Sequence, residues 1–91
     1  MITRETFELA KKISYNDVPK QPDLQKFLRE KHDYHCEIYC HNEDGNTLWN
    51  YQIYTISNDN FTLKGNDYKY SYELALESAL IYLIIKILSE K

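Results

Sequence analysis

The chain has 91 residues, which is room for one domain, and 43% of them are hydrophobic, which is enough for a modest core. The formal net charge is −3, from 11 basic and 14 acidic residues. This balance argues against a general polyanion binder, because affinity for phosphate backbones comes from clustered Lys and Arg.

The first third of the chain predicts two helices. Residues 3–14 form the first, with Thr3 as the expected N-cap, and a proline-containing connector follows. Pro22 suits the first turn of a second helix that runs to about His32. The apolar residues that recur at helical spacing are Ile2, Leu9 and Ile13 for the first helix, and Leu24, Phe27 and Leu28 for the second.

The middle of the chain predicts an antiparallel sheet. Residues 34–43 and 47–57 each alternate between two faces, and Asp44-Gly45 between them is a strong signal for a hairpin turn. Residues 61–63 predict a short third strand. One face carries Tyr34, Cys36, Ile38, Cys40, Trp49, Tyr51, Ile53 and Thr55, and we expect it to lie over the core. The other face carries His35, Glu37, Tyr39, His41, Asn50, Gln52, Tyr54 and Ile56.

Residues 71–90 predict a long C-terminal helix with Ser71 as its N-cap. At about 100° per residue, this helix carries apolar side chains on two sides, so we expect both sides to be buried. The first stripe, expected to pack on the sheet, is Leu76, Ala79, Leu80, Leu83 and Ile87. The second stripe is Leu74, Ile81, Ile85 and Leu88. The first helix, a second copy of the chain or another partner must cover the second stripe.

These elements predict an α+β fold in the order α-α-β-β-β-α. It is a three-stranded antiparallel meander packed against helices, including the long C-terminal helix. We expect residues 1–91 to form a single domain, with an N-terminal helix and connector in 1–20 and an α-β-β-β-α core in 21–91. The residues expected to be buried together are Leu24, Phe27, Leu28, Cys36, Ile38, Trp49, Tyr51, Ile53, Leu76, Ala79, Leu80 and Leu83.

Three segments are typical of one group of small proteins. They are Leu28-Arg29-Glu30-Lys31-His32 at a helix end, Trp49-Asn50-Tyr51-Gln52-Ile53 in a strand, and residues 71–77 at a helix start. With them, residues 22–88 resemble small uncharacterised proteins of phages and gut bacteria, related in style to the phage alpha-beta-alpha sandwich domain. The resemblance implies a compact α+β fold, often dimeric, with no known activity, and it carries over no functional residue. Leu74, Tyr82 and Ile85 stand where that pattern prefers polar residues, which fits the second stripe.

Metal and enzyme chemistry have little support in the sequence. Cys36 and Cys40 lie about 13 Å apart on an extended strand, too far to share one metal ion or to form a disulfide. We therefore expect both thiols to face the core. No catalytic or phosphate-binding motif occurs, and the chain has only 2 glycines. We expect no metal, no cofactor and no enzymatic activity. One alternative is an acid/base patch on the polar sheet face, formed by side chains that are otherwise interpreted as ordinary solvated residues: His35, Glu37, Tyr39 and His41.

We therefore expect a non-enzymatic protein–protein interaction module of phage or mobile-element origin, such as an inhibitor of a host factor. The second stripe is the expected homodimer surface. A partner patch of Tyr39, Tyr54 and Ile56 is expected if the first helix leaves that sheet face open. Residues 1–5 have no apolar signal region and the longest apolar run is seven residues, so we expect a cytoplasmic protein with reduced thiols.

The alternative is a nucleic-acid-associated accessory protein that uses the Lys and Arg of the first two helices. The α-β-β-β-α order is similar to the double-stranded RNA-binding fold, which contacts phosphates mainly with Lys at the start of its last helix. Here that place holds Tyr70-Ser71-Tyr72-Glu73, and the earlier basic residues are interleaved with acidic ones. These charges disfavour a nucleic acid as the partner, and this function therefore stays the alternative.

Overall fold

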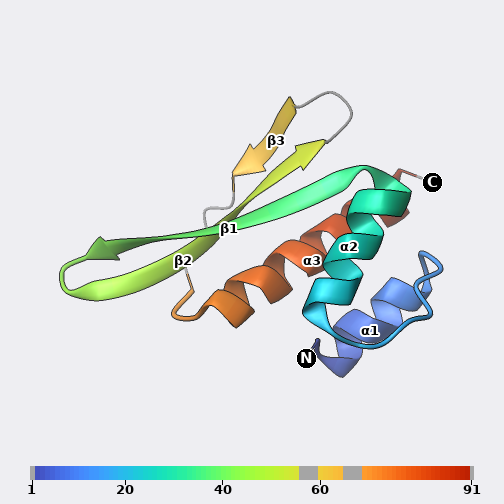
Figure 1. Ribbon diagram of the computed structural model, residues 1–91, viewed down its shortest axis with the longest axis horizontal. Helices are drawn as coiled ribbons and strands as arrows, with labels where there is room; N and C mark the ends of the chain where they lie inside the picture. Colours follow the sequence, from blue (N-terminus) through green and yellow to red (C-terminus); the bar gives the residue numbers. More distant parts are fainter. Residues whose placement is uncertain (1, 56–59, 65–68, 91) are drawn as a thin grey trace.

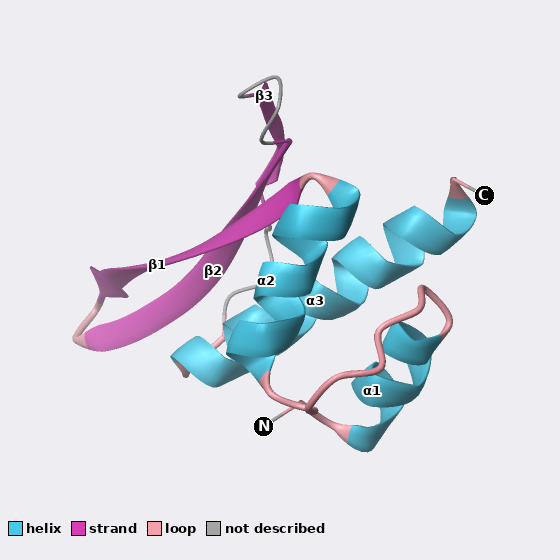
Figure 2. Ribbon diagram, turned by 45° about the vertical axis from the view of Figure 1, so that its right-hand side comes forward, coloured by secondary structure: helices cyan, strands magenta, loops and turns pink. Residues whose placement is uncertain are grey.

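The computed structural model describes residues 2–55, 60–64 and 69–90, and Figure 1 shows the elements that they form. In chain order these are α1 (Arg4–Lys11), α2 (Gln21–His32), β1 (Tyr34–Glu43), β2 (Asn46–Thr55), β3 (Asn60–Lys64) and α3 (Tyr72–Ser89). The helices lie together on one side of the β1–β2 hairpin, whose turn end reaches beyond them (Figures 1 and 2). The longest dimension of the molecule is 42 Å.

The hairpin has the turn and the alternation that the sequence predicts. Asp44 and Gly45 have φ of 51° and 82°, the positive values that a two-residue primed turn requires. The antiparallel register pairs Cys36 with Ile53, and both of these residues are buried beneath the helices. Cys40 is exposed, so the prediction that it faces the core is wrong. Burial along β1 decreases from Cys36 towards the turn, where Asn42 and Glu43 are exposed as well, so the core covers the start of this strand and not its end.

The prediction of a three-stranded meander packed against the helices is also wrong. The sheet surface on which α2 and α3 pack comes from the antiparallel pair β1 and β2. The 5-residue β3 pairs only with residues 52–55 at the end of β2, across a register irregularity. Within the described residues the fold is therefore α+β, with three helices on one long two-stranded hairpin and a C-terminal helix. A strand as short as β3 cannot extend the layer along the hairpin.

α1 is shorter than predicted. Thr3 caps it as expected, because its Oγ1 accepts a hydrogen bond from the Thr6 backbone N–H at 3.2 Å. The helix ends at Lys11 rather than at residue 14, because the chain turns through Ser14, whose φ is 73°. This turn directs Tyr15 into the core, where its side chain is only 1% exposed.

Both ends of α2 lie where the sequence predicts them. Pro22 lies in its first turn, where a missing backbone N–H costs no intrahelical hydrogen bond. The helix stops at Asp33, whose φ of 63° is left-handed and turns the chain into β1.

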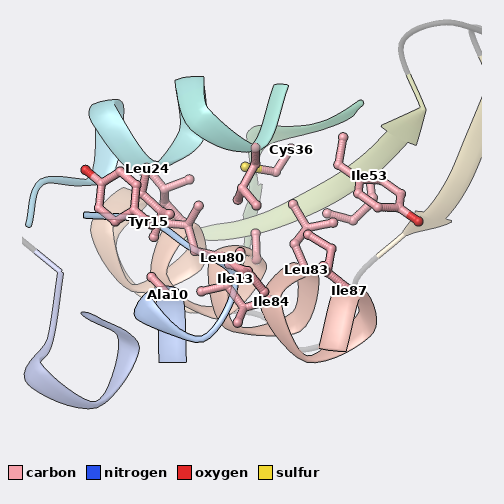
Figure 3. Packing of buried hydrophobic residues seen from close by; sticks show 14 of the residues in the cluster. Ala10, Ile13, Tyr15, Leu24, Cys36, Ile53, Leu80, Leu83, Ile84 and Ile87 are labelled. Carbon is pink, nitrogen blue, oxygen red and sulfur yellow. The ribbon is translucent and has the colours of Figure 1, made fainter. Parts of the chain in front are cut away.

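The core lies between the three helices and the inner face of the hairpin (Figure 3). Of the predicted core, Leu24, Leu28, Cys36, Tyr51, Ile53, Leu76, Ala79, Leu80 and Leu83 are buried, whereas Phe27, Ile38 and Trp49 are half-buried. Tyr15 and Ile84 are core residues that the sequence did not predict. Among the described helices, none combines the length and apolar character needed to cross a membrane.

Candidate interaction surfaces

α3 carries the first candidate surface. Ser71 fixes the start of the helix, because its Oγ accepts a hydrogen bond from the Leu74 backbone N–H at 3.1 Å. The side of α3 that faces the sheet and the other helices is buried: Ala75, Leu76, Ala79, Leu80, Leu83, Ile84 and Ile87. The first predicted stripe is therefore confirmed as the core side of this helix.

One carboxylate, that of Glu77, holds α1 and the start of α2 against α3. Its Oε2 accepts hydrogen bonds from the Thr3 backbone N–H at 3.0 Å, from the Thr3 hydroxyl at 2.9 Å and from the Thr6 hydroxyl. Its Oε1 accepts one from Gln21 Nε2 at 3.3 Å. Burial alone raises the pKa of Glu77, but the hydrogen bonds from Thr6, Thr3 and Gln21 outweigh burial and lower that pKa.

α1 covers part of the second stripe. It packs along α3 beside Ile84, which is fully buried, and Figure 3 shows Ala10 and Ile13 next to it. Ile81 and Leu88 are the members of the second stripe nearest to Ile84 around the helix, and both are half-buried. The first helix is therefore a partial cover.

The rest of the second stripe is open to solvent. Leu74 and Ile85 are 54% and 52% exposed, and a separation of 11 residues brings them to the same side of α3 within about 20°. Tyr70, just before the helix, is 78% exposed and was not among the expected surface residues. From here on, the α3 stripe means Leu74, Ile81, Ile85 and Leu88.

The second candidate surface is the side of the hairpin that points away from the helices, here called the outer face. It consists of His35, Glu37, Tyr39, His41, Asn50, Gln52 and Tyr54. α1 packs on α3, and no helix in the described part of the chain lies over the outer face (Figure 2). Tyr39 and Tyr54 are half-buried on this face, and Ile56 lies outside the described residues.

The polar groups of the outer face contact their neighbours along the hairpin. The Tyr54 hydroxyl donates a hydrogen bond to Gln52 Oε1, and His41 Nε2 lies 3.7 Å from a Glu43 carboxylate oxygen. Burial lowers the pKa of His35, Arg29 adds to this effect, and Glu37 opposes it. Asn50 is fully buried on this face, and the Tyr39 hydroxyl oxygen and His35 Nδ1 are also buried. What the outer face offers to solvent is therefore the partly exposed aromatic side chains and Gln52, together with the exposed carboxylates of Glu37 and, next to this face towards the turn, of Glu43.

A hollow beside α2 does not add a basic surface. It has a volume of about 440 Å³ and lies between the connector after α1 and the side of α2. Its lining mixes charges of both signs with aromatic and amide groups: Tyr15, Asn16, Asp17, Asp23, Lys26, Phe27, Glu30 and Lys31. On α1, Lys11 Nζ lies 3.2 Å from a Glu8 carboxylate oxygen. The basic side chains of these two helices are thus accompanied by acidic ones.

The two thiols have different surroundings. Burial raises the pKa of the Cys36 thiol to about 11, against smaller opposing contributions from hydrogen bonds and from Arg29. Cys40 is free and exposed. Across residues 2–55, 60–64 and 69–90, no group of three or more His, Cys, Asp or Glu is arranged to hold a metal ion.

No known protein family, curated protein or solved structure matches this chain. The likeness to small phage and gut-bacterial proteins therefore stays a prediction, and the case for function comes from the surfaces of this chain.

Proposed function

We propose that this protein is a non-enzymatic interaction module that forms a homodimer through the α3 stripe. The observation that carries this proposal is the exposure of Leu74 and Ile85, two aliphatic side chains that are each more than half accessible on a helix whose other side is buried in the core. Aliphatic side chains contribute about 1.5–3 kcal/mol when fully buried, so leaving this stripe in water is unfavourable.

The spacing of the stripe favours a second copy of the chain as its cover. Its four residues fall at i, i+7, i+11 and i+14, which is close to the repeat of a coiled-coil seam. Two α3 helices related by a two-fold axis would bury the same stripe on both chains, which is the commonest geometry of homo-oligomers. α1 already shields the flank of this stripe, so the contact would centre on Leu74 and Ile85.

In this proposal the protein acts by occupying a surface of another protein, as an inhibitor of a host factor does. A phage or mobile-element origin is supported only by the resemblance of its segments. The two free thiols suit the reducing cytoplasm. The acidic residues among the Lys and Arg of α1 and α2 disfavour a nucleic acid as the partner.

Sedimentation across a range of protein concentrations tests the homodimer. We expect the wild type to dimerise at high micromolar concentration and Ile85→Glu to sediment as a folded monomer, because a buried charge opposes the contact. Val18→Glu is the matched control, since Val18 is an exposed apolar residue of the α1–α2 connector and lies off the stripe. A wild type that stays monomeric at high micromolar concentration contradicts the proposal.

A further inference from the structure

β1 has an unpaired backbone edge. It is the outermost strand in the order β1-β2-β3, so one of its edges faces away from β2. The two-residue turn closes on the pair Glu43 and Asn46, which assigns the odd-numbered residues of β1 to hydrogen bonds with β2. The even-numbered residues therefore direct their backbone N–H and C=O groups outwards.

Only the start of this edge is covered. The Cys36 carbonyl accepts a hydrogen bond from Gln25 Nε2 of α2 at 2.9 Å, which confirms that even-numbered groups point outwards. Ile38, Cys40 and Asn42 follow towards the turn, where Ile38 is half-buried and Cys40 and Asn42 are exposed. Within the described part of the chain, no backbone partner occupies the outward groups of these three residues.

We propose that the edge at Ile38, Cys40 and Asn42 binds an extended segment of another protein as an added antiparallel strand, in which basic residues alternate with apolar ones. Strand addition uses the backbone groups of an open edge for affinity and the alternate side chains for specificity. Protected edges commonly carry Lys, Pro or a bulge, and β1 has none of these.

Charge determines the chemistry of the added strand. Residues 34–55 contain Glu37, Glu43 and Asp44 but no Lys or Arg. Glu37 and Glu43 are exposed and belong to the odd-numbered set that points to the outer face, with Tyr39 and His41 between them and His41 Nε2 3.7 Å from a Glu43 carboxylate oxygen. Every second residue of an added strand would lie beside this row, where a Lys or Arg can approach the carboxylates and the tyrosine ring. The intervening residues would lie beside Ile38 and Cys40, which favours apolar side chains.

The same charges disfavour a second copy of the chain at this edge. If two β1 strands paired around Cys40, Glu37 of one chain would lie directly opposite Glu43 of the second copy, since both are three residues from Cys40. Like charges directly opposite each other destabilise an antiparallel pair. Lys or Arg residues of a basic segment would instead be attracted to Glu37 and Glu43.

A segment of alternating basic and apolar residues is thus the partner class of the proposed interaction module. Binding at the β1 edge rests on the proposed function in one respect, that the protein acts by contacting another protein. It does not require the homodimer, because the β1 edge and the α3 stripe are separate surfaces. Ile85→Glu is expected to abolish dimerisation and to leave binding at the edge unchanged. Failure of one proposal is therefore distinguishable from failure of the other.

Titration of the isotope-labelled full chain with synthetic peptides, followed by NMR, tests the edge. The probe is a blocked octapeptide of alternating Lys and Val. One comparison peptide alternates Glu and Val, and another has Pro in place of the two central Val residues. We expect the Lys–Val peptide to shift the amide signals of Ile38, Cys40 and Asn42 and to slow their hydrogen exchange. We expect the other two peptides to bind at least about tenfold more weakly, since one loses the charge attraction and the other the strand hydrogen bonds.

Two variants separate strand addition from general attraction. Cys40→Pro removes an outward N–H while leaving the β1–β2 ladder intact, and we expect about tenfold weaker binding, with Cys40→Val as the control that keeps this N–H. If Cys40→Pro does not fold, the double variant Glu37→Lys with Glu43→Lys decides, because it should reverse the preference towards the Glu–Val peptide. Equal binding of the Pro-containing peptide, or no change at the three amides, overturns the proposal. The proposal is also overturned if, without any peptide, hydrogen exchange of these three amides becomes slower as the protein concentration rises. That result would assign the edge to a second copy of the chain.

Discussion

The two thiols of β1 are four residues apart and differ in exposure, which predicts a difference in reactivity. Cys36 is 1% exposed and its pKa is raised by burial to about 11, so little thiolate is present at neutral pH. Cys40 is exposed and lies nearer to the hairpin turn. We expect a thiol reagent at pH 7.5 to label one cysteine quickly and the other only after unfolding.

The variant Cys40→Ser identifies the fast thiol, because it should leave only the slow one. Mass spectrometry of the labelled chain measures both rates. Two fast thiols in the folded protein would show that the Cys36 site opens readily and is not part of a closed core.

Glu77 links stability to pH. Its pKa is lowered in the folded state because four hydrogen bonds outweigh the effect of burial, so its contribution to stability is complete above the ordinary glutamate pKa of 4.5. This contribution is lost as the pH falls from there through the lowered folded pKa. At pH 7 we expect Glu77→Gln to reduce the free energy of unfolding by about 1–3 kcal/mol, because donors on Thr3, Thr6 and Gln21 lose a charged acceptor.

Urea unfolding at pH 7 and at pH 3 measures this effect. The difference between the wild type and Glu77→Gln should be smaller at pH 3 than at pH 7, because below 4.5 the unfolded chain takes up a proton at Glu77 and the contribution of the lowered folded pKa is progressively lost. Glu73→Gln is the matched control, since its carboxylate is on the same helix but exposed. A difference that is the same at both pH values would show that Glu77 acts through packing and not through its charge.

Local signals in the sequence were sufficient to predict the hairpin and the helix starts. The Asp44-Gly45 turn fixed the register of β1 and β2, and Thr3 and Ser71 capped their helices as expected. The end of α1 was not predictable in this way. Ile13 continues the apolar repeat of the helix, yet it is buried through a left-handed turn at Ser14 that sequence periodicity does not reveal.

The helical pattern of α3 left open which of its sides are buried, and tertiary contacts determine this. Ile84 was expected to separate two apolar stripes, and it is fully buried because α1 packs beside it. The signal that could have located α1 is Glu77, a carboxylate next to apolar positions whose acceptors match the hydroxyls of Thr3 and Thr6. The extent of the sheet beneath the helices was overestimated for a related reason. Strand propensity predicts that β3 is extended, but it does not tell where along β2 this short strand pairs, and β3 pairs only at the end of β2.

At the scale of the whole molecule, one core joins the helices to the hairpin, and Leu80 lies within it with 0% exposure. We expect Leu80→Ala to lower the free energy of unfolding by about 2–5 kcal/mol, because the loss of the buried side chain is accompanied by a cavity that the surroundings fill only in part. Urea denaturation followed by circular dichroism and by the fluorescence of Trp49 measures this loss.

Leu74→Ala is the control for Leu80→Ala, since it removes the same atoms from a side chain that is 54% exposed on the same helix. At a protein concentration low enough for monomers, its cost should stay within about 0.5 kcal/mol, the usual range for surface substitutions. The two probes should report one transition, because Trp49 is on the hairpin and the circular dichroism is dominated by the helices. If Leu80→Ala is as stable as the wild type, or if the hairpin unfolds before the helices, the hairpin and the helices do not share one cooperative core.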